Sequence, residues 1–343
     1  MMSNDILLDV NNLQTSFFTE DGEVKSVDGV SFQVKKGETV ALVGESGCGK
    51  SVTSYSIMGL VDKPGKIVGG SIKFEDKELT NMPVRSLQKI RGNEISMIFQ
   101  EPLTSLNPLF TVGFQISEVL ILHKKLSKKM ARAKSIDLLK EVGIPRADKV
   151  IDSYPHDLSG GMRQRVMIAM ALACNPKLLI ADEPTTALDV TIQKQILYLM
   201  RQMSQSFDTS IIVITHDLGV VAELADRVVV MYAGQVVEEN DVYSLFEAPK
   251  HPYTKGLLDS TPDIHNLNEK LNSIEGTVPD HTEMPVGCRF HPRCEFAHDR
   301  CREQSPPLFE AIDNAKVRCW LFEDEGVKDY GENRTENTSV RST

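Results

Sequence analysis

The order of apolar and polar residues along the first 240 positions predicts strands that alternate with helices. Short apolar runs rich in β-branched residues are typical of buried strands, and apolar residues at helical spacing are typical of amphipathic helices. Alternation of this kind indicates an α/β fold built on a parallel sheet. Strands are expected at Leu7–Phe18, Ser31–Lys35, Thr39–Val43, Glu94–Phe99, Leu178–Ala181 and Ile211–Thr215, helices at Lys50–Leu60, Ser127–Val142, Met162–Cys174 and Thr191–Ser206, and a hairpin at Val228–Glu238.

The pattern changes in the last third of the chain. Beyond about Asn240, Pro, His and Asn become frequent and the periodicity fades, and from Glu323 onward the sequence is polar and poor in apolar residues. Such a composition buries too little apolar surface to fold, so residues 323–343 are expected to be disordered. At roughly 100–200 residues per domain, a chain of 343 residues suggests two domains, or one domain with an extension.

The sequence offers no candidate for a membrane-spanning segment or a secretory signal. Its longest apolar runs, Ile211–Thr215 and Val228–Tyr232, are far shorter than the ~20 residues that cross a bilayer. The N-terminus has no basic region followed by an apolar core. We therefore expect a cytosolic protein, which reaches a membrane only where a partner holds it.

Charge and composition exclude two classes of protein. The 48 acidic side chains outnumber the 38 basic ones and give a formal net charge of −10, which argues against general nucleic-acid binding, because phosphates attract a basic excess. A hydrophobic fraction of 41% and a charged fraction of 25% are those of a globular protein, so a wholly disordered chain is excluded.

The residues that follow the expected strand Thr39–Val43 match the phosphate-binding pattern G-x-x-x-x-G-K-[ST]. Glycines there let successive backbone N–H groups surround phosphate oxygens, and the N-terminal end of the next helix adds positive potential. Lys50 is expected to reach the β- and γ-phosphates, and the Ser51 hydroxyl to bind Mg²⁺. The expected nucleotide contacts are Gly44, Ser46, Gly47, Gly49, Lys50, Ser51 and Val52.

Two acidic residues, Asp182 and Glu183, follow the expected strand Leu178–Ala181. At the strand tip Asp182 can hold Mg²⁺, as in other phosphate-loop enzymes. Glu183 is placed to orient and deprotonate an attacking water. Taken alone, such a pair is as often a solvated strand end. The phosphate loop upstream makes it a candidate catalytic pair.

A Ser-Gly-Gly sequence at 159–161 stands directly before an expected helix and upstream of the acidic pair. By itself it is an ordinary helix cap or an anion-binding helix terminus. Its position among the other motifs is more specific. They follow one another as the phosphate loop, Gln100, Leu158–Gln164, Asp182-Glu183, Ala187-Leu188-Asp189 and His216. With this series the chain resembles, over about residues 6–260, the ATPase subunits of ABC transporters.

The resemblance implies roles for the residues around the nucleotide. Phe17 is similar to the aromatic residue that stacks on adenine, with Phe18 as the alternative. Gln100 resembles the residue that senses the γ-phosphate and Mg²⁺, so the implied Mg²⁺ set is Ser51, Gln100 and Asp182. His216 resembles the switch histidine at the γ-phosphate. The implied catalytic set is Glu183, His216 and Gln100.

The resemblance also implies a dimer. Ser159, Gly160 and Gly161 are similar to the signature that contacts the ATP held by the opposite subunit, and Asp189 lies in the loop that crosses the interface. With one phosphate loop and one signature, the chain needs a second ATPase subunit. A heterodimer is expected and a homodimer is the alternative. Met162, where many members have Gln, matches the peptide-importer branch.

Three further segments resemble that branch, namely Gln100–Pro108, His251–Thr254 and Gly287–Cys294. The closest similarity is to the first ATPase subunit of oligopeptide or dipeptide importers. The implied fold is a P-loop NTPase cassette with a RecA-like core, an antiparallel β subdomain and a helical subdomain. The expected boundaries are 1–260 for the ATPase domain, with the helical subdomain at about 101–160, then 261–322 for a Cys-rich extension and 323–343 for the tail.

The implied function is ATP hydrolysis that powers peptide import from the cytoplasmic face of the membrane. The implied partners are a second ATPase, two integral membrane permeases and, indirectly, an extracytoplasmic peptide-binding protein, with no nucleic acid. Nickel importers share part of the pattern and remain an alternative for the cargo. A soluble ABC ATPase not coupled to transport, and a regulatory module without catalysis, are the alternatives of other classes.

Four of the six cysteines, Cys288, Cys294, Cys301 and Cys319, lie in one C-terminal segment, which in a reducing compartment favours metal binding over disulfides. Zinc usually requires a close C-x₂₋₄-C pair, which is missing here, although His291 is a further possible ligand. A [4Fe–4S] cluster tolerates irregular spacing, and unliganded thiols are the third alternative. The resemblance to peptide-importer ATPases implies the [4Fe–4S] cluster.

Overall fold

The computed structural model describes residues 5–20, 22–100, 105–186, 188–260, 274–311 and 315–323. The tail that was expected to be disordered lies outside this range, except for Glu323. The strands are β1 (Ile6–Thr19), β2 (Gly22–Lys35), β3 (Thr39–Val43), β4 (Gly65–Phe74), β5 (Lys77–Glu78), β6 (Ile95–Ile98), β7 (Leu178–Asp182), β8 (Ser210–Thr215), β9 (Arg227–Tyr232), β10 (Gln235–Asp241), β11 (Phe309–Glu310) and β12 (Lys316–Val317). The α-helices are α1 (Lys50–Met58), α2 (Val84–Ile90), α4 (Val112–Lys124), α5 (Lys128–Glu141), α6 (Ala147–Val150), α7 (Gly160–Leu172), α8 (Val190–Phe207), α9 (Leu218–Leu224), α10 (Val242–Glu247), α11 (Pro252–Asp259) and α12 (Asp299–Glu303).

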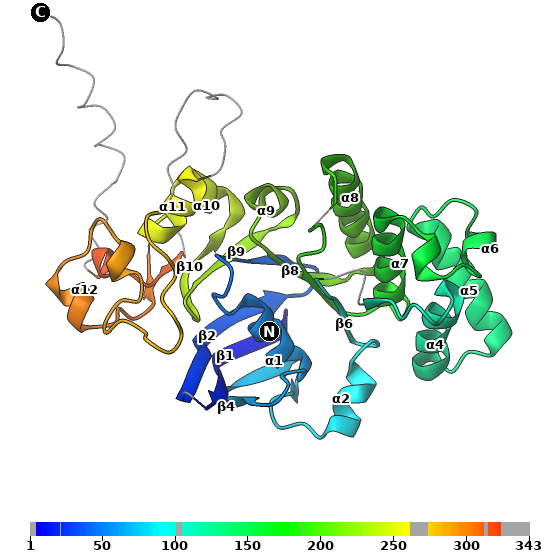
Figure 1. The fold of residues 1–343 in the computed structure, drawn as a ribbon, viewed down its shortest axis with the longest axis horizontal. Helices are drawn as coiled ribbons and strands as arrows, with labels where there is room; N and C mark the ends of the chain where they lie inside the picture. The colour runs from blue at the N-terminus through cyan, green and yellow to red at the C-terminus, as the bar shows by residue number, and fades with distance from the viewer. Residues whose placement is uncertain are drawn as a thin grey trace, which may run out of the picture.

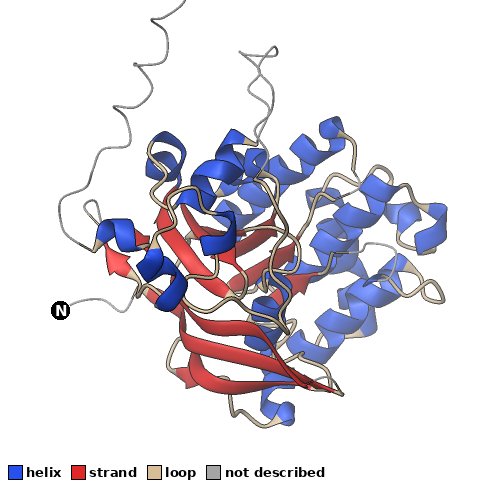
Figure 2. Cartoon of the chain, turned by 60° about the vertical axis from the view of Figure 1, so that its left-hand side comes forward, coloured by secondary structure: helices blue, strands red, loops and turns tan. Residues whose placement is uncertain are grey.

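The described strands form two sheets. The larger has the order β11-β12-β10-β9-β3-β8-β7-β6, in which β9, β3, β8, β7 and β6 run parallel. The smaller is antiparallel with the order β2-β1-β4-β5. The small sheet lies on one side of the large one, and α8, α9 and α10 lie on the other (Figure 1). Figure 2 shows the same layers from a second direction.

The central strands β3 and β8 of the large sheet are buried along their whole length, which explains their uninterrupted runs of residues suited to the interior. Leu42 and Ile212 pack with α1 and the small sheet in one core cluster. Ala41 and Val213, their neighbours along β3 and β8, pack with α4, α5, α7, α8 and α9 in another. Among the described residues, none of the helices combines the length and apolar character that crossing a bilayer requires.

The expected α/β alternation is present, with informative differences at some ends. Strand β3 has the expected bounds, and α1 ends at Met58 because Gly59 turns the chain with a φ of 62°. The alternation in β1 is weak because the register shifts between Val10 and Leu13. The sequence pattern did not predict β4, β5, α2 or α4. It also did not predict α10 and α11, beyond the point where the periodicity fades.

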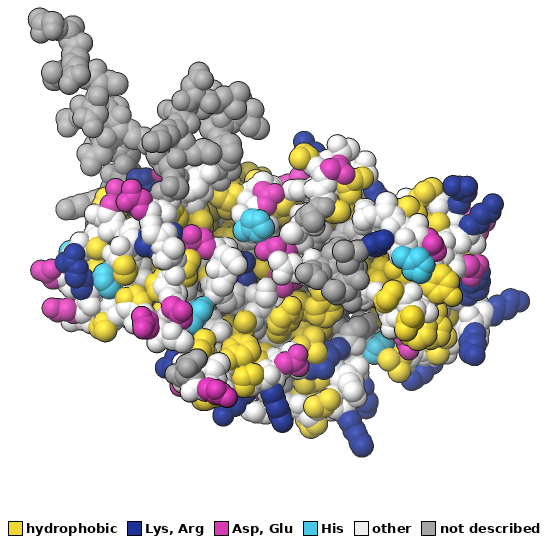
Figure 3. All heavy atoms as spheres, in the orientation of Figure 1, with side chains coloured by type: hydrophobic (Ala, Val, Ile, Leu, Met, Phe, Trp, Pro, Cys, Tyr) yellow, Lys and Arg dark blue, Asp and Glu magenta, His cyan; other side chains and the backbone are white. Residues whose placement is uncertain are grey.

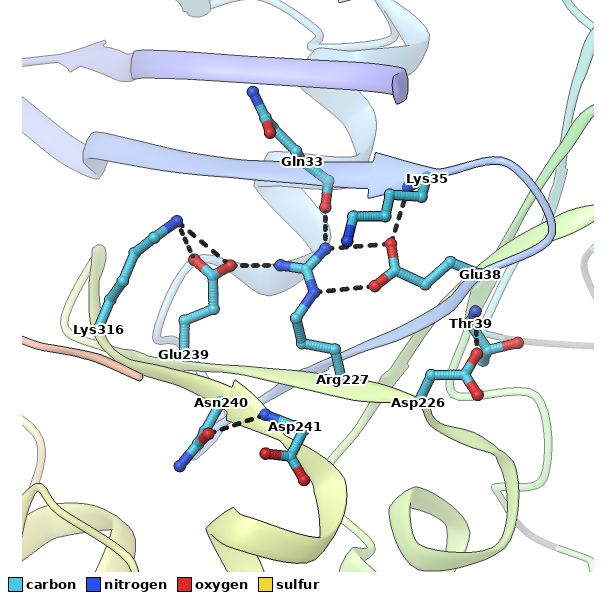
Figure 4. A network of polar contacts seen from close by, with 10 residues as sticks. All are labelled: Gln33, Lys35, Glu38, Thr39, Asp226, Arg227, Glu239, Asn240, Asp241 and Lys316. Carbon is cyan, nitrogen blue, oxygen red and sulfur yellow. Dashed lines mark hydrogen bonds and ion pairs between the residues drawn. The ribbon is translucent and has the colours of Figure 1, made fainter. Parts of the chain in front are cut away.

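A network of ion pairs around Arg227 joins the two sheets and the C-terminal segment (Figure 4). Its guanidinium donates to Glu38 (Nε to Oε1, 2.9 Å), to Glu239 of β10 and to the backbone carbonyl of Gln33 in β2. Lys316 of β12 lies 3.3 Å from Glu239 on its other side. Burial lowers the pKa of Arg227, but Glu38 and Glu239 outweigh it and raise that pKa above its usual value. The network fixes strands from both sheets around one cation.

The charge is distributed unevenly over the surface. Lys and Arg gather at the end of the molecule formed by α5 and α6 (Figure 3). Helix α5 alone has the sequence KKMARAKSIDLLKE. The net charge of −10 is therefore the sum over the whole chain, and it does not describe this basic end.

Candidate nucleotide-binding and catalytic site

The candidate site lies at the carboxyl ends of four neighbouring strands, β3, β8, β7 and β6. The phosphate loop follows β3, and His216 follows β8. Asp182 ends β7, Glu183 comes directly after it, and Gln100 follows β6. Parallel strands present their carboxyl ends at the same edge of a sheet. The topology therefore brings together motifs that are far apart in the sequence.

Lys50 begins α1 and folds back over the loop that precedes it. Its Nζ donates to the backbone carbonyls of Gly44 (2.7 Å) and Glu45 (2.9 Å), and the residue is 7% exposed. These partners are dipoles rather than carboxylates. The positive charge therefore stays available to a phosphate group held by the loop.

The glycines of the loop are required by its tight packing against neighbouring strands. Gly44 has a φ of 152° and Gly49 a φ of 100°, in the region that favours glycine. A Cβ on Gly44 would lie 2.2 Å from the carbonyl oxygen of Met231, and one on Gly49 would lie 2.4 Å from that of Ser26. The remaining predicted contacts are exposed or half-buried, namely Ser46, Gly47, Ser51 and Val52.

Asp182 has the environment of a carboxylate that binds a cation. It is fully buried, and neither carboxylate oxygen accepts a hydrogen bond of good geometry. Burial raises its pKa, although the nearby Ser51 hydroxyl and the Lys50 charge offset part of the effect. An unpaired buried carboxylate is costly, and Mg²⁺ held between Asp182 and Ser51 would relieve that cost. The residues present thus fit Mg²⁺.

Glu183 is the centre of a hydrogen-bonded group made by three strand ends. Gln100 donates its side-chain amide to Oε2 (2.9 Å), and the Thr186 hydroxyl donates to the same oxygen (2.9 Å). The Nδ1 of His216 lies 3.0 Å from Oε1. The structure therefore brings together all three residues of the predicted catalytic set.

The backbone of Glu183 is held in an unusual conformation. Its φ is 48°, in the left-handed region that residues other than glycine rarely adopt, while its N–H donates to the carbonyl of Ile214 (2.8 Å). Burial raises the pKa of its carboxyl group, but hydrogen bonds from His216, Thr186 and Gln100 outweigh burial and lower the pKa below its usual value. The Glu183 carboxylate is thus held in one orientation by hydrogen bonds and is ionised at neutral pH.

The signature residues lie apart from this cluster. Ser159 and Gly160 are exposed at the start of α7, where the Ser159 side chain accepts from the N–H of Met162, and a Cβ on Gly160 would meet open space. Gly161 packs against Ile192. Helices α1 and α7 lie well apart in the molecule (Figure 1). Asp189 caps α8 through its side chain.

The two candidate aromatic residues lie at the end of β1. Phe17 is half-buried, with its ring directly beside Gly65 of β4. Phe18 is 42% exposed, and the ammonium group of Lys66 lies 4.4 Å from its ring centroid. Both rings are thus partly accessible, and the choice of Phe17 stays a prediction.

Sequence reasoning missed several residues that contact the site. Thr186 donates to Glu183, and its only sequence signal is a hydroxyl three residues after the acid. Three residues beyond position 250 contact the phosphate loop. The Tyr253 hydroxyl accepts from the N–H of Glu45 (2.9 Å), Arg293 forms an ion pair with the Glu45 side chain, and His281 contacts the carbonyl oxygen of Gly47. No local pattern links residues so far apart.

The four C-terminal cysteines line one cavity, which also touches His251 and His291. Its volume is about 10 Å³, room for roughly one water molecule. In the part of the chain that the structure describes, no group of three or more His, Cys, Asp or Glu side chains is placed to hold a metal ion. Burial raises the pKa of Cys294 to about 11 and that of Cys319 to about 12. The four thiols are the kind of donor that the expected [4Fe–4S] cluster requires, but the cavity that they line must widen to admit it.

Comparison with known proteins identifies the family. The ABC transporter family matches residues 27–186, and the oligopeptide/dipeptide transporter C-terminal region matches residues 237–301. The chain is 60% identical, over 94% of its length and 98% of the relative, to the oligopeptide transport ATP-binding protein AppD of Bacillus subtilis. It is 49% identical, over 91% of its length and 96% of the relative, to the dipeptide transport ATP-binding protein DppD of Escherichia coli.

A solved structure supports the same assignment. The chain matches a dimeric ATP-binding cassette in a post-hydrolysis state with ADP and Pi, at a TM-score of 0.62 and 28% identity. The match covers 68% of this chain and 98% of the solved one. These similarities confirm the expected cassette fold. The chain belongs to the ABC transporter family, as an ATP-binding protein of the oligopeptide and dipeptide transport branch.

Proposed function

We propose that this chain binds Mg·ATP and hydrolyses it to power the import of oligopeptides or dipeptides across the cytoplasmic membrane. The observation that carries the proposal is the convergence of Gln100, Glu183 and His216 on one edge of the sheet, beside buried Asp182 and Lys50. The cargo follows from the relatives, which are named for oligopeptide and dipeptide transport.

In this proposal Glu183 is the general base. Its carboxylate accepts a proton from a water molecule as the water oxygen attacks the γ-phosphorus, and the bond to the ADP oxygen breaks. Gln100 and His216 hold Glu183 in place and, by the family resemblance, contact the γ-phosphate. Ser51 and Asp182, with Gln100 as the further ligand, would hold Mg²⁺, which would supply positive charge to the phosphates.

The active assembly is proposed to be a pair of ATPase subunits. Support comes from the exposure of Ser159 and Gly160 on a helix that lies apart from the phosphate loop. A heterodimer with a related ATPase is proposed, bound to two permeases at the cytoplasmic face of the membrane and fed by a peptide-binding protein. Purification of the intact complex with only one kind of ATPase chain would contradict the heterodimer.

The function is tested by complementation in cells that lack this subunit. We expect the wild-type chain to restore uptake of labelled peptides and to co-purify with permeases, and Lys50→Ala to assemble without restoring uptake. Nickel uptake without peptide uptake would overturn the cargo, and a chain that purifies without membrane subunits would overturn the coupling to transport.

We also propose that Cys288, Cys294, Cys301 and Cys319, within an extension at 261–322, ligate a [4Fe–4S] cluster that cross-links the segment. Support comes from the grouping of the four cysteines around one cavity and from the half-buried Arg318, whose charge interacts with Cys288. The cavity must widen to admit the cluster. Anaerobically purified protein should contain about four irons per chain and absorb broadly near ~400 nm. Stoichiometric zinc without iron would contradict the cluster.

A further inference from the structure

The phosphate loop forms an ion pair with the C-terminal segment, between Glu45 and Arg293. Arg293 forms a two-pronged contact with the Glu45 carboxylate, from Nη1 to Oε2 (2.7 Å) and from Nη2 to Oε1 (3.1 Å). The Arg293 side chain is only 4% exposed, and its Nε donates to the carbonyl of Glu275 (2.9 Å). The Arg293 guanidinium is thus held between the Glu275 carbonyl and the Glu45 carboxylate of the loop.

Two more residues from the same part of the chain hold the loop. The N–H of Glu45 donates to the Tyr253 hydroxyl (2.9 Å), and Nε2 of His281 lies 2.7 Å from the carbonyl oxygen of Gly47. The second ring nitrogen of His281 lies 3.2 Å from the carbonyl oxygen of Lys25. These contacts, together with the tight packing of the loop glycines, leave Glu45 little freedom to move.

The charge on Glu45 needs a counter-charge if the loop is to hold a triphosphate. A carboxylate within a loop that encloses phosphates repels them, and the repulsion grows where water is partly excluded. A bidentate guanidinium cancels that charge with fixed geometry, which a lysine does less well. The Glu45 pair raises the pKa of Arg293, so the guanidinium stays charged.

We propose that Arg293 is a positioning residue of the nucleotide site, which neutralises Glu45 and fixes the phosphate loop for ATP. The inference rests on the proposed ATP site and extends it to the C-terminal segment. Since Arg293 stands next to Cys294, the segment that carries the cysteines contributes a side chain to ATP binding.

The test measures the Kd of Mg·ATP for the purified full-length chain, by isothermal titration calorimetry. Arg293→Met leaves the Glu45 charge uncompensated and should raise the Kd about tenfold, the effect of about one charge–charge interaction. Arg293→Lys keeps the positive charge but loses the bidentate guanidinium, and it should raise the Kd about threefold. Removing both charges, in Glu45→Gln with Arg293→Met, should bring the Kd back to within about threefold of wild type.

The matched control is Arg300→Met. Arg300 lies over the Trp320 ring, 3.6 Å from its centroid, and pairs with Glu323 in the same segment. Its loss perturbs the segment without touching the phosphate loop, so the Kd should stay within about twofold of wild type. In the assembled transporter, Arg293→Met should raise the KM for ATP and leave kcat unchanged, because the hydrolytic residues are intact.

Three outcomes would overturn the inference while wild type still binds ATP: a wild-type Kd for Arg293→Met, a double variant as weak as Arg293→Met, or an equal loss in Arg300→Met. Should Arg293→Met fail to fold, as judged by its Tm, Arg293→Lys and the double variant carry the same decision. Failure of the wild-type chain to bind Mg·ATP would overturn the proposed function and the inference together.

Discussion

The group around Glu183 and the network around Arg227 each saturate one charged side chain with several partners, but they differ in exposure and strain. Glu183 has a left-handed backbone and a side chain that is itself 13% exposed, but the side chain of its partner His216 is 62% exposed. The side chain of Arg227 is 18% exposed and its partner Glu239 is 7% exposed, in regular strands (Figure 4). The first group has an exposed histidine on the side where a reactant can approach, whereas the second joins regular strands.

The difference between the groups suggests how to recognise function in such networks. Hydrogen bonds lower the pKa of Glu183 and stabilise a carboxylate at the surface of the site. The acids around Arg227 raise its pKa and stabilise a cation that joins strands of the two sheets. Breaking a network that holds the fold together should lower the Tm, whereas breaking a network that takes part in the reaction should lower kcat.

The largest expected effect is the loss of hydrolysis in Glu183→Gln. The amide keeps a hydrogen-bonding group of the same size but cannot accept the proton of water, so kcat should fall by about 10³-fold. The Kd of ATP and the Tm should change little, because the Glu183 side chain is not part of the hydrophobic core. ATPase assays of the assembled transporter check the rate. Hydrolysis close to wild type would remove Glu183 from the role of base.

The next largest effect is on stability, in Arg227→Met. This variant removes the cation between Glu38 and buried Glu239, which should lower the free energy of unfolding by about 3 kcal/mol. The loss is at the low end for a broken buried pair because Lys316 still faces Glu239. The Tm should fall by several degrees while kcat at a permissive temperature is kept. Arg132→Met is the control, since its pair with Asp152 is exposed and should contribute below ~1 kcal/mol. Equal losses in both variants would contradict the contrast.

The sequence predicted the groups to different degrees. The phosphate loop and the acids of β7 were predictable because each is a local pattern at a strand end, and parallel strand order brings Gln100 and His216 to the same edge. The left-handed conformation of Glu183 was not predictable, because tertiary packing imposes it. The ion pair between Glu45 and Arg293 spans 248 residues and has no local signature. Likewise, the clustering of four cysteines predicted a metal site, but nothing in the sequence predicted the volume of the cavity that they line.

A smaller effect is expected on the pH dependence of hydrolysis in His216→Ala. The hydrogen bond from His216 helps to lower the pKa of Glu183, so its loss should let that pKa rise. Glu183 must be ionised to act as a base, and the acid limb of the pH–rate profile should therefore move to higher pH. At pH 7 kcat should fall about tenfold or more through the lost contact. His123→Ala, on α4, is the matched control and should leave the profile unchanged, whereas an acid limb that stays in place or moves to lower pH would contradict the coupling.

The smallest expected effect separates the two aromatic candidates of β1. A stacked base contributes about 1–3 kcal/mol when fully covered, and a ring at the surface contributes less, so Phe17→Ala should raise the Kd of Mg·ATP about fivefold. Phe17→Tyr keeps the ring and should bind as wild type. Phe18→Ala should change the Kd by less than about twofold, because Lys66 already covers one face of that ring. Stacking tolerates any base, so Phe17→Ala should weaken GTP by the same factor as ATP. The opposite ranking of the two alanine variants would assign the stacking ring to Phe18, and equal, negligible effects would show that the exposed end of β1 has no part in the nucleotide site.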